Sequence, residues 1–274
     1  MKWLVLLALC GCQSVLGLDE TSFTGNDRDG SIDVPPPLPP DACTGMACSV
    51  YTSCKALKMQ QPNGASGVYR INAGTGEFPA YCDQTSGGGG WTLALKIDGR
   101  LPTFAYDQPI WESPTLLATG ATALDHQQAK LETWNAVPFT EVRVAMEFPI
   151  DSGQVRAIVL PLAGQRLADL FKAGTPTATN LGRTAWKGLV GPTASLQLNC
   201  NSEGANVHYD AMRVRLGIIG NNENDCASTD SRLGVGGGGD GCGAPETQAA
   251  GNAACFGGDN GDVDLAAFAW VFVR

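Results

Sequence analysis

Oxygen-bearing side chains gather in two short segments near the end of the chain. The first is Asn221-Asn-Glu-Asn-Asp225, and the second is Asp259-Asn-Gly-Asp-Val-Asp264, where acidic residues recur around Gly261. Calcium prefers about six to eight oxygen ligands, and carboxylates packed this closely repel one another unless a cation neutralises them. The residue types therefore predict a calcium site. Its candidate ligands are Asn221, Asn222, Glu223, Asn224, Asp225, Asp259, Asn260, Asp262 and Asp264.

Both segments also have the composition of ordinary exposed turns. Asn and Asp accept local hydrogen bonds in turns, and Gly tolerates their backbone angles. Under this interpretation the side chains are solvated and hold no ion. Asp240 and Glu246, in the loop between Cys226 and Cys255, are further candidate ligand-binding residues. Sequence alone leaves both interpretations open.

Motifs of known catalytic sites are absent from the sequence, which favours a binding protein over an enzyme. Neither Gly-x-Ser-x-Gly nor His-Glu-x-x-His occurs. The two histidines stand apart from any nucleophile or zinc motif: we expect His126 on a helix surface and His208 in a structural role. Glycoside hydrolysis needs only two carboxylates, so a glycan hydrolase stays an alternative.

Composition indicates one large domain with many loops. Of the 274 residues, 43% are hydrophobic, enough for a sizeable core, while 35 Gly and 16 Pro favour turns and irregular segments. The formal net charge is -9, and no basic cluster interrupts the acidic balance. Nucleic acid is therefore not an expected partner.

The first residues predict export and a lipid anchor. Lys2 precedes an apolar run, residues 3–9, that is too short to span a bilayer. Leu9-Cys10-Gly11-Cys12 resembles a bacterial lipobox, which makes residues 1–12 a lipoprotein signal peptide and Cys12 the lipidated residue. This predicts attachment to the outer membrane or cell surface. Cleavage near Gly17 is the alternative and would give a freely secreted protein.

The remaining cysteines predict disulfides in an oxidising compartment. Lipidation of Cys12 leaves an even set: Cys43, Cys48, Cys54, Cys82, Cys200, Cys226, Cys242 and Cys255. Spacing does not settle their pairing. A zinc site is the weaker alternative because the chain contains no Cys-x-x-Cys pair.

The chain divides by composition into a tether and a domain. Residues 13–42 are rich in Asp, Gly, Ser and Pro and end in a proline run that favours stiff, extended backbone. Residues 43–274 form the predicted domain. Alternating and apolar runs predict strands at 67–71, 78–82, 91–97, 141–148, 155–160, 195–199, 212–219 and 266–273, with short helices at 54–59, capped by Ser53, and 165–172. This is an α+β fold with twisted, mostly antiparallel sheets, few short helices and long Gly-rich loops.

One segment resembles a known family signature. Tyr81-Cys82-Asp83-Gln-Thr-Ser-Gly-Gly-Gly-Gly-Trp91-Thr92 is similar to the start of fibrinogen-like domains, where Tyr-Cys-Asp precedes a Gly-rich turn and a Trp. The resemblance implies a Cys54–Cys82 disulfide. The residues themselves predict that Asp83 caps backbone amides and that Trp91 is buried against the turn.

A second resemblance lies in the C-terminal third and favours the intelectin branch. Residues 211–217, 221–226 and 233–239 are similar in order to the calcium-dependent glycan-binding region of intelectins, where a hydrophobic strand is followed by an Asn/Glu/His cluster beside a Cys and then by a glycine run. The likeness implies calcium-dependent glycan binding through cis-diol hydroxyls. The predicted function is therefore a calcium-assisted, lectin-like surface lipoprotein. The alternative is an adhesion module that binds a surface protein without metal or glycan.

Overall fold

The computed structural model describes residues 49–209, 211–239 and 248–274, all within one compact unit, Cys43–Arg274. The predicted signal peptide and tether lie outside these residues. So do the predicted site residues Cys12, Cys43, Cys48, Asp240, Cys242 and Glu246. In the described part of the chain, no helix has the length and apolar character needed to cross a membrane.

Short helices and many strands make up the described residues. The α-helices are α1 (Cys54–Gln60), α2 (Thr133–Ala136), α3 (Leu167–Lys172) and α4 (Arg183–Val190). The strands are β1 (Val50–Tyr51), β2 (Gly67–Asn72), β3 (Glu77–Asp83), β4 (Trp91–Asp98), β5 (Ala129–Lys130), β6 (Val142–Glu147), β7 (Val155–Leu160), β8 (Thr177–Ala178), β9 (Asn199–His208), β10 (Arg213–Asn221), β11 (Ser231–Gly238), β12 (Ala250–Ala254), β13 (Val263–Ala266) and β14 (Phe268–Val273). The predicted α+β class with mostly antiparallel sheets is confirmed.

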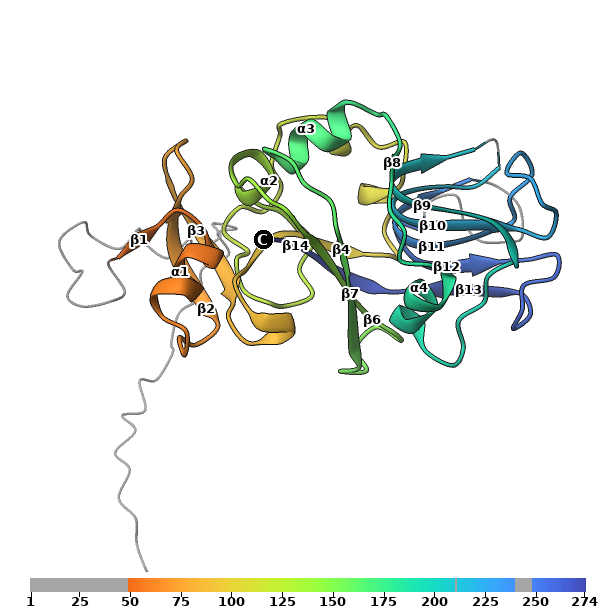
Figure 1. The fold of residues 1–274 in the computed structure, drawn as a ribbon, viewed down its shortest axis with the longest axis horizontal. Helices are drawn as coiled ribbons and strands as arrows, with labels where there is room; N and C mark the ends of the chain where they lie inside the picture. The colour runs from red at the N-terminus through yellow and green to blue at the C-terminus, as the bar shows by residue number, and fades with distance from the viewer. Residues whose placement is uncertain (1–48, 210, 240–247) are drawn as a thin grey trace, which may run out of the picture. The chain divides into compact units, whose positions relative to one another are not determined.

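An eight-stranded sheet is built around β14. Its order is β1-β2-β3-β4-β14-β6-β7, with β5 paired to β4, and only β1 and β2 run parallel (Figure 1). Every residue of β14 is buried, as its apolar sequence predicts. The β6–β7 hairpin is also confirmed, with Val142 opposite Leu160.

A six-stranded antiparallel sheet, in the order β13-β12-β11-β10-β9-β8, carries the C-terminal loops (Figure 1). Gly204, Gly217, Gly234 and Gly251 lie opposite one another across four neighbouring strands. A Cβ on Gly217 would lie 2.4 Å from the carbonyl oxygen of Leu233, and one on Gly234 would lie 2.1 Å from that of Leu216. The close approach of the strands at this row therefore requires glycine.

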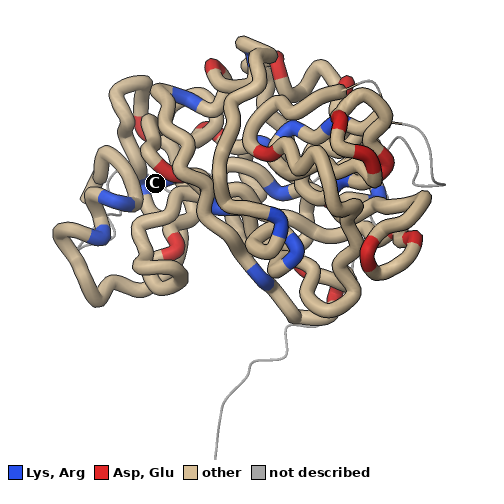
Figure 2. Tube along the Cα trace, turned by 45° about the vertical axis from the view of Figure 1, so that its right-hand side comes forward, with Lys and Arg blue, Asp and Glu red and all other residues tan. Residues whose placement is uncertain are grey.

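One apolar core joins the two sheets. It includes Trp134, Phe171 and Trp186 from the helices and Leu216 and Val271 from the sheets, all fully buried. The rings of Trp134 and Phe171 are stacked with centroids 5.0 Å apart. Helix α4 contacts strands of both sheets. Basic and acidic residues are interspersed along the described trace (Figure 2).

Three sequence predictions about secondary structure need comment. Ser53 caps α1 as predicted, since its Oγ accepts a hydrogen bond from Ala56 N at 3.1 Å. The strand predicted at 195–199 is wrong: residues 195–198 lie in no strand, and β9 begins at Asn199. His126 lies in a bend rather than on a helix, because its ring packs against Phe268, with centroids 4.7 Å apart.

Candidate functional site

The signature turn that follows β3 is a buried scaffold. Cys54 and Cys82 form the disulfide that the fibrinogen-like resemblance implies, and both are fully buried. Asp83 Oδ1 accepts hydrogen bonds from Thr85 N at 3.0 Å and Ser86 N at 2.9 Å, which confirms the predicted cap. Trp91 is fully buried, and its indole nitrogen donates to Ser86 O at 3.1 Å. These contacts hold the side chains of Asp83 and Trp91 in structural roles.

Arg143 fixes the remaining oxygen of Asp83. Its Nη1 lies 2.6 Å from Asp83 Oδ2, and both side chains are almost covered. The backbone amides and the Arg143 guanidinium outweigh burial, which alone would raise the pKa of Asp83, and lower that pKa to about 2. A carboxylate this strongly held is suited to a structural role rather than to proton transfer.

The two segments predicted to bind calcium are attached to one stretch of chain, Ser195–Asn199. Residues of this stretch donate a hydrogen bond in each attachment: Ser195 Oγ to Gly261 O at 2.5 Å, Leu196 N to Asp259 Oδ1 at 3.0 Å, Gln197 Nε2 to Phe256 O at 3.1 Å, and Asn199 Nδ2 to Asn222 O at 2.7 Å. The segments 221–225 and 256–261 are therefore held at the same end of the six-stranded sheet. This end is the candidate functional site.

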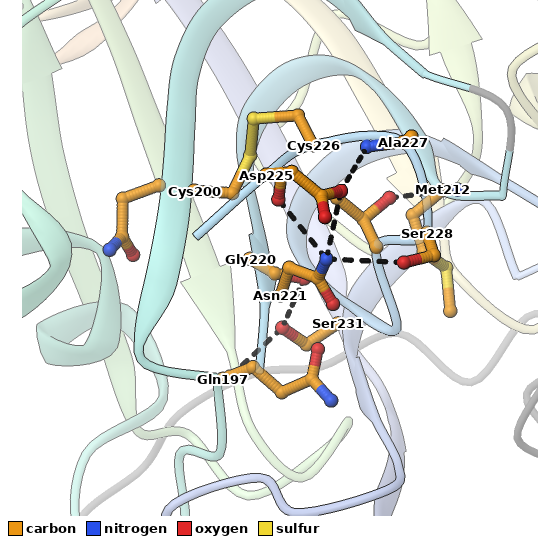
Figure 3. The surroundings of a disulfide bond; sticks show 12 residues. Gln197, Cys200, Met212, Gly220, Asn221, Asp225, Cys226, Ala227, Ser228 and Ser231 are labelled. Carbon is orange, nitrogen blue, oxygen red and sulfur yellow. Dashed lines mark hydrogen bonds between the residues drawn. A yellow bond between two sulfur atoms is a disulfide. The ribbon is translucent and has the colours of Figure 1, made fainter. Parts of the chain in front are cut away.

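The Asn221–Asp225 loop folds on its own polar groups (Figure 3). Asn221 is buried, and its Nδ2 donates to Asp225 O at 3.1 Å and Ser228 Oγ at 3.3 Å. Asp225 Oδ1 accepts from Ala227 N at 2.9 Å. Asn221 and one oxygen of Asp225 thus shape the turn. Among the described residues, the side chains of Asn222, Glu223 and Asn224 are exposed and have no hydrogen-bond partner.

A disulfide and strained backbone fix the base of this loop. Cys200 on β9 is bonded to Cys226, with Cα atoms 5.3 Å apart (Figure 3). Cys200, Asn201 and Phe256 have φ values of 62°, 48° and 48°, in the left-handed region. For residues other than Gly this conformation costs about 1–2 kcal/mol each, so the surrounding contacts must impose it. Strain of this kind commonly accompanies functional sites.

The second predicted segment is largely engaged in structural contacts. Asp259 forms ion pairs with Arg183 at 2.5 Å and with Lys187. Hydrogen bonds from these cations and from Leu196 N outweigh the effect of burial and lower the pKa of Asp259 to about 2. Asn260 Nδ2 donates to Pro192 O at 2.8 Å. Asp259 therefore joins the loop to α4.

Asp264 lies apart from this joint. Gln248 Nε2 donates to its Oδ1 at 2.5 Å, and burial raises its pKa. Asp262 is exposed. Within residues 49–209, 211–239 and 248–274, no group of three or more His, Cys, Asp or Glu side chains is placed to hold a metal ion. Calcium binding stays a prediction, and the exposed oxygens of residues 222–225 are where it would be tested.

Two exposed apolar side chains complete the site, and sequence reasoning missed both. Phe256 is 69% exposed and Leu198 is 67% exposed. Leu198 lies between Gln197 and Asn199, the residues that hold the two loops. We call Leu198, Asn222, Glu223, Asn224 and Phe256 the loop cluster. The available signal was a Phe next to a Cys in a Gly-rich turn, which does not reveal exposure.

Comparison with known proteins gives a distant structural likeness. No model of a known protein family matches the sequence. The structure is similar to the fibrinogen-like globe domain of human ANGPTL6, with 13% sequence identity and a TM-score of 0.38 over 83% of this chain and 98% of that chain. The ligand must therefore be argued from the chemistry of the loop cluster.

Proposed function

We propose that this protein is an exported, lipid-anchored binding protein whose domain recognises carbohydrate through the loop cluster. The observation that carries the proposal is the exposed Phe256 ring, together with the exposed, unpartnered side chains of residues 222–224, on two loops that are hydrogen-bonded to the same stretch, Ser195–Asn199. A ring that is 69% exposed gains free energy when the apolar face of a ligand covers it. The fibrinogen-like and intelectin-like features of the sequence support the same function.

The chemistry of the loop cluster suits a sugar. A pyranose has an apolar C–H face, which packs against the negative π-face of an aromatic ring. Its hydroxyl groups donate hydrogen bonds to amide and carboxylate oxygens. The Phe256 ring would pack against the C–H face. The side-chain oxygens of Asn222, Glu223 and Asn224 would accept hydrogen bonds from the hydroxyl groups. Because the disulfide and the Ser195–Asn199 contacts fix the loops in advance, little ordering entropy opposes binding.

Calcium would strengthen this binding. The side chains of Asn222, Glu223, Asn224 and Asp225 carry six oxygens, the lower end of the about six to eight that calcium prefers, so the diol of a sugar could complete its shell. A cation there would also neutralise Glu223 and Asp225. The proposed lectin is therefore calcium-assisted, with the metal and the sugar stabilising each other.

A glycan array, probed with the full chain in calcium and in chelator, tests the proposal. We expect retention on a subset of glycans, weakened by chelator and abolished by Phe256→Ala. Met59→Ala is the matched control, since Met59 on α1 is 77% exposed and distant in the fold from the cluster. Failure to bind any glycan in either buffer refutes carbohydrate recognition.

The same exposed apolar pair also favours the second candidate, a protein-binding module. Leu198 and Phe256 are both exposed apolar side chains of the loop cluster, and exposed apolar surface is typical of interaction sites. A pull-down from surface proteins decides between the two. Capture that is lost in Phe256→Ala but insensitive to sugars and chelator would favour protein binding.

A further inference from the structure

A separate cavity lies on the eight-stranded sheet, on the face opposite the main core. Its volume is about 430 Å³, within the range of about 300–1,000 Å³ usual for small-molecule sites. Residues from β6, β7, β14 and the loop before β5 line it, including Leu124, His126, Arg143, Glu147, Val155 and Trp270. None of these residues belongs to the loop cluster. The cavity is therefore independent of the proposed glycan site.

Two planar, nitrogen-bearing groups lie over the aromatic floor of the cavity. The Arg143 guanidinium lies 5.1 Å from the centroid of the Phe272 ring. The His126 ring packs against Trp270, with centroids 5.5 Å apart. These contacts hold both groups in fixed orientations, as a preformed binding site requires.

The carboxylates behind these groups have both oxygens occupied. Asp83 accepts two backbone amides on Oδ1 and Arg143 on Oδ2. Glu147 accepts Gly153 N on Oε1 and faces His126 Nε2 at 2.5 Å from Oε2. The two side chains are only 7% and 2% exposed. The oxygens of both carboxylates therefore already accept hydrogen bonds from groups of the protein itself.

Hydrogen-bond donors, in contrast, are left over. Among the described residues, Arg143 donates one hydrogen bond, from Nη1, which leaves Nη2 and Nε for a ligand. His126 offers no further donor, because Glu147 faces its Nε2 and Asp151 lies 3.3 Å from its Nδ1. At the rim, Leu124 and Val155 are 45% and 50% exposed. A complementary ligand has an acceptor for Arg143 and an apolar body for the rim.

We propose that this cavity binds a small organic carboxylate. The carboxylate accepts from Arg143 Nη2 and Nε, and its apolar ring or chain lies between Leu124 and Val155. A carboxylate is favoured over a hydroxyl because its two oxygens can accept two parallel hydrogen bonds from the planar guanidinium, whereas a hydroxyl can accept only one in this geometry. The apolar body gains by covering the two exposed aliphatic side chains.

Calorimetric titration of the full chain with matched acid and amide probes tests this proposal. Hydrocinnamate should bind at least about tenfold more tightly than hydrocinnamamide, a difference of about 1.4 kcal/mol. Galacturonate against galactose shows whether a sugar acid is also accepted. Equal affinity for acid and amide, or no binding of either acid, overturns the proposal.

A charge placed at the rim tests the location. Val155→Asp should weaken hydrocinnamate binding at least about tenfold by like-charge repulsion, without changing the melting temperature. Val68→Asp is the matched control, because Val68 on β2 is also 50% exposed and does not line the cavity. Equal affinity of Val155→Asp and wild type would place the ligand elsewhere.

Two further variants separate this site from the glycan site and test Arg143. Phe256→Ala should leave hydrocinnamate binding unchanged; a loss of binding would show that the two sites are not independent.

Arg143→Lys keeps the positive charge but loses the planar guanidinium that can donate two parallel hydrogen bonds, so the affinity for hydrocinnamate should fall about tenfold while Asp83 stays paired. Unchanged affinity in a folded Arg143→Lys protein contradicts the proposed contact.

Discussion

The signature turn and the loop cluster share the same structural features but differ in whether their aromatic side chain is buried. Each has a disulfide at its base, an Asp that accepts backbone amides and an aromatic residue next to glycine. In the turn, Trp91 is fully buried, whereas in the cluster Phe256 is 69% exposed. One arrangement stabilises the sheet, and the other leaves its side chains exposed to solvent. The burial of the aromatic side chain, rather than the local sequence motif, therefore distinguishes the structural turn from the candidate site.

The largest expected effect comes from removing the two aromatic rings. Trp91→Ala should lower the free energy of unfolding by about 3–5 kcal/mol, because it leaves a cavity and an unpaired Ser86 carbonyl. Phe256→Ala should change it by less than about 0.5 kcal/mol. Urea unfolding of both variants measures the contrast. Similar losses for the two would show that Phe256 is part of the core.

The two disulfides sharpen the comparison, because they span almost equal lengths of chain. Their sequence separations are 28 and 26, so the restraint on the unfolded state is nearly the same, about 3.5 kcal/mol. Replacing Cys54 and Cys82 by Ser also buries two hydroxyls, so we expect this double variant to lose more stability than Cys200→Ser/Cys226→Ser. Only the second pair should reduce glycan retention. Thermal unfolding and the glycan array test these two expectations.

Acid should act on the turn through Asp83. Its pKa of about 2 when folded lies below the unfolded value of about 3.9, so its ionised form stabilises the fold above pH 4. This contribution, on the order of 2 kcal/mol, is lost as the pH falls from 4 towards 2. Because Asp259 titrates in the same window, the measurement is the difference in acid unfolding between wild type and Asp83→Asn. Parallel profiles would refute the role of Asp83.

The smallest effect is expected from calcium on the loop cluster. Calcium at a tenfold excess over its dissociation constant would add about 1.4 kcal/mol to the free energy of unfolding. Glu223→Gln should remove much of this gain, while Glu77→Gln, a surface ion-pair partner of Arg70, should not. Differential scanning calorimetry with and without calcium gives the answer. An identical melting temperature in both buffers contradicts calcium binding.

Sequence reasoning succeeded where residue pattern and burial agree. The apolar run of β14, the β6–β7 alternation and the Ser53 cap follow from local chemistry, and Asp83 from turn chemistry. Strand β11 was missed because Ser231–Gly238 is rich in glycine, which normally weakens strands, and its place depends on close approach to β10.

The binding surfaces were harder to predict. The exposure of Phe256 follows from hydrogen bonds to residues some sixty positions earlier, such as the one from Gln197. The cavity on the eight-stranded sheet joins Arg143 to Phe272 and His126 to Trp270, pairs far apart in the chain. Such contacts depend on tertiary packing, which local spacing does not encode.

The position of β14 between β4 and β6 has a consequence for biogenesis. During synthesis β4 and β6 emerge first, and neither can complete its hydrogen-bond ladder until β14 inserts between them. Until then, both strands offer unsatisfied edges to neighbouring chains. We therefore expect this protein to depend on holding chaperones until β14 is inserted. We also expect its yield to fall when many chains are synthesised at once.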